Sequence, residues 1–511
     1  MKIREEYDII VIGGGPAGLS SAAAAKSAGA GSVLLIERDS TPGGILPQCI
    51  HTGFGLIEFK EELTGPEYAN RWISKAIDAG VDILTDTMVL NISDRKEVTV
   101  MGRETGITSI KAKAVILAMG CREKTRGALC IPGSRPAGIF TAGCAQRLVN
   151  IDGFIPGKKI FILGSGDIGL IMARRMILEG SEVVAVCEKA DHPGGLERNV
   201  QQCLRDFGIP LILSSSIVGI HGRKRVDSVT IARFSKEGKP IPGTFETIPC
   251  DTVLLSVGLI PENELSRDVD IKMNSQTGGP MVDDRMQTSI PGIFACGNVL
   301  KVYDLVDNVT EDAIKAGQAA WEYVENDFKN DFTGISCSIV GEFPGGQKCE
   351  SSSETGDESC ESSGETGDES CEENAGAEAG DFSAGKDFRE ITCTICPIGC
   401  IIKMWRDDSD AWKIDGNKCK RGEQYAMDEI SDPKRTLTTT MLQRLPHNKD
   451  GIEIFTDRLI AVRSNRPIPL RQTLSAMDQI RQTIIRTPVK EGEVVITDVS
   501  GTKADIIVTR T

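Results

Sequence analysis

The sequence predicts an α/β protein with two Rossmann-like three-layer domains, an acidic disordered linker and a small α+β domain that carries a four-cysteine metal site. A glycine fingerprint occurs twice, and each copy follows an apolar strand and precedes a helix and a second strand that ends in glutamate. The third observation is a group of cysteines near the C-terminus, whose short spacing is typical of metal ligands.

Length and charge limit the kinds of protein this chain can be. With 511 residues it is too long for one hydrophobic core, and about three domains are expected. A net charge of −15 argues against nucleic acid and anionic membranes as partners, because both would repel the chain. We find no bilayer-spanning apolar run and no signal peptide, and the 16 cysteines fit a reducing compartment, so we expect a cytoplasmic protein.

Composition changes abruptly at an acidic repeat, in which CESSSETGDES is followed by CESSGETGDES. This stretch has too few apolar residues to form a core, so residues 336–388 are predicted to be a disordered tether. We interpret its repeated cysteines (Cys349, Cys360 and Cys371) as incidental thiols rather than metal ligands, because a flexible acidic chain does not preorganise a site. The tether separates a discontinuous first nucleotide domain (1–123 and 261–335) and a second one (124–260) from a cysteine domain (389–511).

The first fingerprint lies in YDIIVIGGGPAGLSSAAAAKSAGAGSVLLIERD. Gly13, Gly15 and Gly18 permit a tight turn, close approach of the backbone to a pyrophosphate, and close packing of helix on strand. The helix N-terminus adds a partial positive charge. Glu37 ends the second strand, where a carboxylate accepts hydrogen bonds from an adenosine ribose.

The second fingerprint lies in KKIFILGSGDIGLIMARRMILEGSEVVAVCEK, with Gly164, Gly166 and Gly169. Two mononucleotide folds in one chain imply two dinucleotides, one held tightly and one exchanging. Glu188 ends the second strand and would repel a 2′-phosphate, which favours NADH over NADPH. The neighbouring Lys189 weakens that preference, because a cation beside the acid partly cancels its charge.

The order of motifs over residues 6–325 resembles the pyridine nucleotide-disulfide oxidoreductase superfamily in its thioredoxin reductase-like arrangement. AVILAMG, DTVLLSVGLIPENEL and TSIPGIFACGNV are similar to its two crossovers and its flavin-covering segment, although Asn298 stands where most members have an aspartate. The resemblance implies FAD at the first fingerprint and NAD(H) at the second. The implied FAD contacts are Gly13, Gly15, Pro16, Ala17, Gly18, Glu37, Arg38, Gly44, Val89, Ala118, Gly120, Gly297 and Asn298. The implied NAD contacts are Gly164, Gly166, Asp167, Ile168, Gly169, Glu188 and Gly258.

The cysteine pair of the disulfide reductases in this superfamily is missing. Each of the two places where it could stand has a single cysteine, Cys49 in PGGILPQCIHTGFG and Cys144 in TAGCAQ, so no local disulfide can form. Cys49 and His51 are candidate catalytic residues, as a thiolate–imidazole pair near the flavin. The alternative, which we favour, is that both residues only shape a loop packed on the flavin.

Two further resemblances concern segments on either side of the acidic tether. GSRPAGIFTAGCAQ and GGILPQCIHTGFGL are similar to flavoproteins related to the alpha subunits of sarcosine oxidase and to the flavoprotein encoded near anaerobic glycerol-3-phosphate dehydrogenases. CTICPIGCIIKMW and GNKCKRGEQYAMDE resemble a small cysteine-motif domain of undefined function found in the same gene clusters. The resemblance implies a partner dehydrogenase for glycerol 3-phosphate or a similar hydroxy substrate.

Four cysteines of the tail form the predicted metal site: Cys393, Cys396, Cys400 and Cys419. Four thiolates suit a [4Fe–4S] cluster or tetrahedral zinc. We favour the cluster, because zinc sites of this size usually have two CxxC knuckles and the spacing resembles the N-terminal cluster domain of molybdopterin oxidoreductases. Free thiols are a weaker third interpretation. Strands in LTTTMLQ, LIAVRS and GEVVITDV and an amphipathic helix in RQTLSAMDQIRQTII are predicted around the site.

The sequence as a whole predicts an NADH-linked, FAD-dependent oxidoreductase that passes electrons between nicotinamide, FAD and the cluster, with the tether letting the cluster shuttle to a partner. One alternative is a flavin-dependent NADH oxidase or peroxidase that uses Cys49 and has a zinc-stapled docking tail. The other is a non-catalytic assembly subunit whose flavin is structural.

Overall fold

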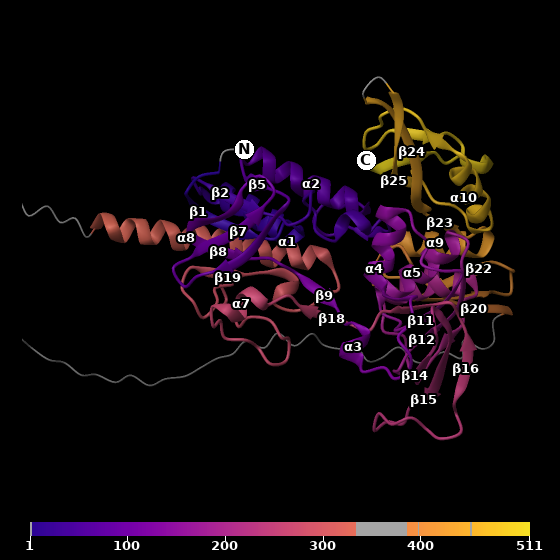
Figure 1. The fold of residues 1–511 in the computed structure, drawn as a ribbon. Coiled ribbons are helices and arrows are strands. Elements are labelled where there is room, and N and C mark those ends of the chain that lie inside the picture. The colour runs from indigo at the N-terminus through magenta and orange to yellow at the C-terminus, as the bar shows by residue number, and fades with distance from the viewer. Residues whose placement is uncertain (1–2, 334–385, 397, 450–451) are drawn as a thin grey trace, which may run out of the picture.

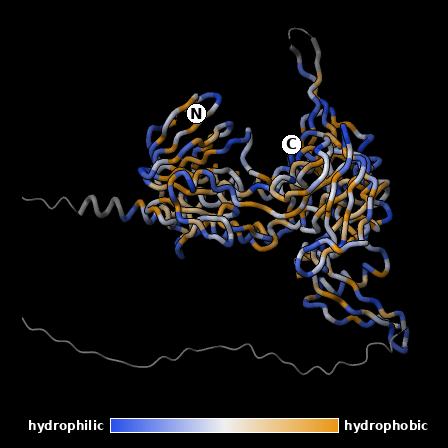
Figure 2. Tube along the Cα trace, turned by 60° about the horizontal axis from the view of Figure 1, so that its bottom comes forward, coloured by the Kyte–Doolittle hydropathy of each residue, from blue (hydrophilic) through white to orange (hydrophobic). Residues whose placement is uncertain are grey.

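The computed structural model describes residues 3–333, 386–396, 398–449 and 452–511 (Figure 1). Residues 336–385 of the predicted linker, with its cysteines Cys349, Cys360 and Cys371, therefore lie outside the described residues. None of the helices in the described ranges is long and apolar enough to cross a lipid bilayer. Figure 2 shows hydrophobic stretches concentrated inside the folded parts, with hydrophilic residues common at the outer loops.

The first nucleotide-binding domain is a mostly parallel sheet with the order β5-β2-β1-β8-β7-β6, and β19 pairs with β8. Strands β1, β2, β5, β8 and β19 are parallel, whereas β6 and β7 form an antiparallel extension. Helices α1 and α8 pack against each other on one face, and α2 packs on α1. The strands are β1 (Glu6–Ile12), β2 (Val33–Ile36), β5 (Asp82–Leu84), β6 (Thr87–Ile92), β7 (Glu97–Gly102), β8 (Gly106–Leu117) and β19 (Ile293–Ala295); the helices are α1 (Pro16–Ala28), α2 (Gly65–Asp78) and α8 (Val306–Thr333).

The second nucleotide-binding domain repeats the plan with a five-stranded parallel sheet in the order β10-β17-β11-β12-β13. An antiparallel sheet, β14-β15-β16, flanks it. Strands β9 and β18 pair where the chain enters and leaves this domain. The elements are β9 (Cys121–Glu123), β10 (Ile139–Thr141), α4 (Ala142–Arg147), β11 (Lys159–Leu163), α5 (Asp167–Leu178), β12 (Glu182–Cys187), β13 (Leu211–Ile212), β14 (Ser215–Gly222), β15 (Val226–Arg233), β16 (Glu246–Pro249), β17 (Thr252–Leu255) and β18 (Leu259–Pro261).

The C-terminal part has two cores rather than the single small one that the sequence suggests. A cysteine module consists of the sheet β20-β21-β22 and helix α9, and a second, five-stranded sheet has the order β27-β24-β25-β29-β28 with helix α10. The predicted amphipathic helix is confirmed as α10. Strand β20 pairs with β21 from Lys386, so the ordered domain starts before the expected boundary at residue 389. The elements are β20 (Lys386–Thr392), β21 (Ile401–Arg406), β22 (Trp412–Asp415), α9 (Lys420–Ser431), β23 (Lys434–Arg435), β24 (Thr438–Lys449), β25 (Ile452–Ser464), β26 (Ile468–Pro469), α10 (Thr473–Gln482), β27 (Ile484–Ile485), β28 (Val494–Ile496) and β29 (Ile506–Arg510).

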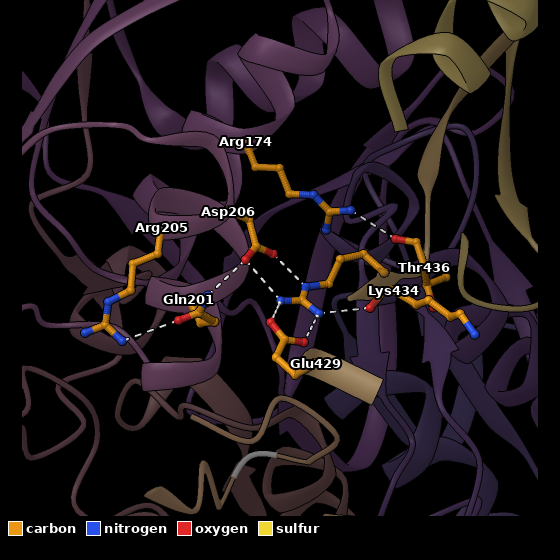
Figure 3. A network of polar contacts seen from close by, with 8 residues as sticks. Arg174, Gln201, Arg205, Asp206, Glu429, Lys434 and Thr436 are labelled. Carbon is orange, nitrogen blue, oxygen red and sulfur yellow. Dashed lines mark hydrogen bonds and ion pairs between the residues drawn. The ribbon is translucent and has the colours of Figure 1, made fainter. Parts of the chain in front are cut away.

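The C-terminal part is docked on the second nucleotide-binding domain through a buried ion-pair network at β23 and α9 (Figure 3). Arg435 donates to Asp206 at 2.6 and 3.0 Å and to Glu429 at 2.7 and 2.8 Å, and the Arg435 and Asp206 side chains are each only 3% exposed. Burial alone would lower the pKa of Arg435, but the hydrogen bonds to Glu429 and Asp206 outweigh it and raise the pKa. Leu178, at the end of α5, completes the hydrophobic core of the C-terminal sheet.

The same sheet also contacts the first nucleotide-binding domain. Arg463 on β25 pairs with Glu67 on α2 at 3.1 Å, and Arg510 on β29 donates to the carbonyl oxygen of Pro47. A second donor of Arg510 reaches the carbonyl oxygen of Asn150 at 2.9 Å, in the other nucleotide domain. The described C-terminal domain therefore bridges both nucleotide domains, which disagrees with the expectation that it shuttles on its tether.

We predict that Arg435→Ala lowers the free energy of unfolding by roughly 3–5 kcal/mol, because it leaves Asp206 and Glu429 buried without their cation. Urea unfolding followed by circular dichroism would measure the loss. The matched control is Arg444→Ala, which breaks the exposed pair with Asp457 and is expected to change stability little. Equal effects of the two substitutions would contradict the role given to Arg435.

Candidate functional site

The first glycine loop joins β1 to α1 through contacts that only glycine permits. Gly13 has a φ of +104°, and a Cβ there would lie 2.4 Å from the carbonyl oxygen of Ala118. A Cβ on Gly18 would lie 1.7 Å from the carbonyl oxygen of Gly13, so α1 packs directly on the turn. At Gly15 a Cβ would meet only Gly44, at 3.9 Å, among the described residues. Backbone atoms therefore fill the space beside Gly13 and Gly18, whereas the space beside Gly15 at the helix N-terminus is open. This arrangement fits a dinucleotide phosphate.

Glu37 has a role in this loop that the sequence did not indicate. The side chain is 6% exposed, and its Oε2 accepts a hydrogen bond from the backbone N–H of Gly14 at 2.8 Å. Its Oε1 accepts from the backbone N–H of Asp39 at 2.9 Å. Glu37 therefore holds the glycine turn in shape, in addition to the expected ribose contact. Its neighbour Arg38 is exposed.

The other residues expected to contact FAD come from separate segments around the loop. Gly297 opens a short helix (η5, Gly297–Val299), and a Cβ on it would lie 2.7 Å from the Cβ of Ala17. Asn298 accepts from the backbone N–H of Tyr303 at 3.2 Å and donates to the Cys121 sulfur at 3.5 Å. The remaining members are Pro16, the first residue of α1, Gly44 and Gly120, both with positive φ, and Val89, which is buried in the core on the other side of the sheet.

The second glycine loop, between β11 and α5, repeats this construction. A Cβ on Gly164 would lie 2.0 Å from the carbonyl oxygen of Ser256, and one on Gly169 would lie 2.5 Å from the carbonyl oxygen of Gly164. No atom of the described residues lies within 4 Å of a Cβ on Gly166, so the approach to this helix N-terminus is open. Gly258 follows β17 with a φ of +102°. The geometry fits a second dinucleotide.

Glu188 and Asp167 hold the second loop, and Ile168 packs on the domain core. Glu188 accepts from the backbone N–H of Ser165 at 2.9 Å and from its hydroxyl at 2.7 Å. Burial raises the pKa of Glu188, but the hydrogen bonds from Ala190 and Ser165 outweigh it, so the pKa is lowered and the carboxylate stays charged. Asp167 accepts from the backbone N–H of Leu196 at 2.8 Å.

Cys49 and His51 do not form a thiolate–imidazole pair in the described structure. The Cys49 thiol donates to Gln146 Oε1 at 3.6 Å, and burial raises its pKa to about 12. Burial, together with the charges of Arg198 and Arg174, lowers the pKa of His51 to about 3, and its Nδ1 has no hydrogen-bond partner among the described residues. Both side chains are neutral at physiological pH, which supports the structural interpretation of this loop over the nucleophilic one.

The four tail cysteines lie at one end of the cysteine module. The backbone N–H of Cys393 donates to the carbonyl oxygen of Cys400 at 2.8 Å, and Cys419 is the N-cap of α9. Burial raises the pKa of Cys393, and the charges of Cys396, Cys400 and Cys419 raise it further. Hydrogen bonds from the backbone N–H groups of Gly422 and Arg421 lower the pKa of Cys419. Among the described residues, however, no three Cys, His, Asp or Glu side chains stand close enough to hold a metal ion.

Sequence reasoning missed the polar residues that surround the Cys49 loop. Gln146 contacts both Gln48 and Cys49, and Arg174 and Arg198 influence His51 from the second nucleotide domain. Gln146 lies on the short helix α4, where one glutamine gives no signal in the sequence. The one signal in the sequence was the unusual pair of arginines within the apolar run of α5.

The two loops define an oxidoreductase that binds two dinucleotides. Residues 7–320 match the sequence profile described as pyridine nucleotide-disulphide oxidoreductase, and the chain belongs to this family. It is accordingly an FAD-dependent NAD(P)H oxidoreductase. Residues 420–510 match a profile described as a protein of unknown function (DUF1667). This match begins directly after Cys419, the last of the four cysteines.

Similarities to individual proteins are consistent with membership of this family. A thioredoxin reductase from Treponema pallidum (strain Nichols) is 27% identical over 63% of this chain and 98% of the relative. One of the subunits of opine oxidase, from Rhizobium meliloti, is 27% identical over 58% of this chain and 59% of the relative. The crystal structure of T. acidophilum thioredoxin reductase has a TM-score of 0.52 at 23% identity, covering 62% of this chain and 99% of that one, and supports the fold alone.

Substitutions of two glycines in the second loop are expected to have different effects, one on stability and the other on nucleotide binding. We expect Gly169→Ala to lower stability by roughly 1–3 kcal/mol, because its Cβ would meet the Gly164 carbonyl oxygen. Gly166→Ala is expected to keep stability and weaken NADH binding by about tenfold. Thermal unfolding and fluorescence titration would check the pair, and unchanged NADH affinity in Gly166→Ala would argue against binding at this loop.

Cys49 is expected to resist alkylation in the folded protein. Its thiolate is scarce at pH 8 because burial raises its pKa to about 12, whereas Cys130 and Cys144 are exposed. Iodoacetamide treatment at about pH 8 followed by peptide mass mapping should label Cys130 and Cys144 and leave Cys49 unmodified. Labelling of Cys49 at the rate of Cys130 would restore the nucleophile hypothesis.

Proposed function

We propose that this flavoprotein is NADH-linked and passes electrons between nicotinamide, FAD and a [4Fe–4S] cluster held by Cys393, Cys396, Cys400 and Cys419. When bound, FAD takes a hydride as two electrons and releases them singly, and a thiolate-bound cluster supplies a one-electron carrier. The observation that carries the proposal is the state of Cys49, which stands in one of the two places where disulfide reductases of this superfamily carry a cysteine pair. It is a buried neutral thiol whose hydrogen-bond partner is Gln146.

The donor set of the cysteine module supports a thiolate-bound metal. Burial raises the pKa of Cys393, and the charges of the other three cysteines raise it further; this electrostatic cost would be relieved if a cation bound the thiolates. Cys419 is already favoured as a thiolate by two backbone N–H groups at the start of α9. The proposal rests on the identity and spacing of these four ligands, whose side chains would have to move together to hold the metal. Cys393 is the buried cysteine of the site, and Cys419 is the exposed one.

Glu188 supports NADH over NADPH in this proposal. Its carboxylate is charged and fixed by Ser165 and Ala190 at the end of β12, where a 2′-phosphate would be repelled. The residues of the Cys49 loop position the reactants and do not supply an acid–base group, because His51 and Cys49 are both neutral and buried. This also makes a Cys49-dependent peroxidase the weaker alternative.

A partner dehydrogenase completes the proposed system, which would resemble anaerobic glycerol 3-phosphate oxidation. The similarity to opine oxidase, whose matching chain is by its name one of several subunits, supports an assembly with other proteins. The segment that carries the cysteines exposes Ile398 and Ile401 by 64% and 53%, which suits contact with another protein. Because the C-terminal sheet is docked on both nucleotide domains, we propose that the partner comes to a fixed cysteine module.

The cluster is tested by anaerobic purification with analysis of iron, labile sulfide and zinc. We expect iron and sulfide in the wild-type protein and their loss in Cys393→Ser and Cys396→Ser, while NADH still bleaches the flavin in both variants. Cys130→Ser is the control, because this exposed cysteine lies outside the cysteine module. Zinc without sulfide in the wild-type protein would overturn the electron-transfer role of the tail.

A further inference from the structure

A cavity of about 30 Å³ lies where the three folded parts of the chain meet. The Cys49 loop contributes Ile50, His51 and Thr52, the second nucleotide domain contributes α5 and the following segment 198–203, and the C-terminal sheet contributes Thr438. Of the residues assigned above to a cofactor, a metal or catalysis, only His51 is among those that line it. The cavity therefore lies apart from both glycine loops and from the tail cysteines.

The lining of this cavity is strongly cationic. Arg174, Arg175 and Arg198 all contribute to it, and no aspartate or glutamate of the described residues does. Arg175 is neutralised by its ion pair with Glu179. Arg198 is 5% exposed and has a long contact of 3.4 Å with Glu62, a carboxylate that is itself 38% exposed. The charge of Asp206 also acts on Arg174, but that carboxylate accepts hydrogen bonds from Arg435. The two guanidinium charges at the cavity are therefore only partly compensated, at a place where water screens them poorly.

Two hydrogen-bonding atoms at the cavity have no partner in the described structure. They are the Nε of Arg174 and the Nδ1 of His51, and both atoms are buried. The Nη2 of Arg174 donates to the carbonyl oxygen of Thr436 at 3.0 Å, which orients the guanidinium without neutralising it. A buried, charged donor without an acceptor is costly, and an anion is the ligand that satisfies it. Arg174 and Arg198 already act on His51, since their charges add to burial in lowering its pKa.

We propose that this cavity binds one small oxyanion, the carboxylate or phosphate group of a ligand, through Arg174, Arg198 and His51. Arginine matches both groups because its planar fork donates paired hydrogen bonds to two oxygens. Since Thr436 orients Arg174 and Thr438 lines the cavity, the docked C-terminal sheet completes the site. The site goes beyond the proposed function and does not depend on the metal in the tail.

The test uses the full chain loaded with FAD and saturated with NAD⁺, so that the glycine loops are occupied. Inorganic phosphate and acetate are titrated separately at constant ionic strength, and binding is measured by calorimetry. We expect saturable binding of at least one of them, with phosphate alone indicating a phosphorylated ligand and acetate alone a carboxylate. Arg198→Gln should weaken this binding by about tenfold. Arg205→Gln is the matched control, because Arg205 lies two residues beyond the segment 198–203, does not line the cavity and has a side chain that is 55% exposed.

A second measurement keeps the proposal testable if Arg198→Gln fails to fold. The chain has four histidines, so the ¹⁵N imidazole signals of the wild-type protein can be assigned with His51→Gln. The His51 signals should shift on addition of the binding anion, because an acceptor enters the cavity beside Nδ1. An unmoved His51 signal, absence of saturable binding, or equal binding by the wild type and Arg198→Gln would each overturn the site.

Discussion

The arrangement of this protein depends on one buried arginine. Arg435 lies on β23 of the C-terminal part, and its side chain pairs with Asp206 of the second nucleotide domain and with Glu429 of the cysteine module. Separating Arg435 from Asp206 and Glu429 would leave buried charges unpaired, so these contacts hold the C-terminal part in one position on the second nucleotide domain. Leu178 reinforces the contact by filling the core of the C-terminal sheet from the end of α5.

Docking of the C-terminal sheet has consequences for both nucleotide domains. Arg463 pairs with Glu67 on one side, and Arg510 donates to backbone carbonyls of Pro47 and Asn150, which lie in different domains. A rotation of one nucleotide domain against the other would break these contacts. In this member of the family, the tail works as a bridge that holds the two nucleotide domains together, and the cysteine module rests on that bridge.

The Cys49 loop shows how a family scaffold is adapted when its disulfide is absent. The thiol is buried against Gln146, and burial with the positive charges of Arg174 and Arg198 keeps His51 neutral. The same charges give the neighbouring cavity its preference for an anion. The single cysteine at this position and the cationic cavity therefore lie in the same region, at the junction of all three folded parts.

Local patterns were enough to predict both nucleotide loops, because a strand, three glycines and a helix form from neighbours in sequence. The family and the fold class followed from them, as did helix α10. The sequence could not show that Glu37 and Glu188 brace the glycine turns, because a carboxylate at that position has the same pattern whether it faces a ribose or a backbone N–H. The pairing of Arg435 with Asp206, 229 residues earlier, the burial of Cys49 and the cationic cavity were decided only by tertiary structure, since each arises where distant segments exclude water together.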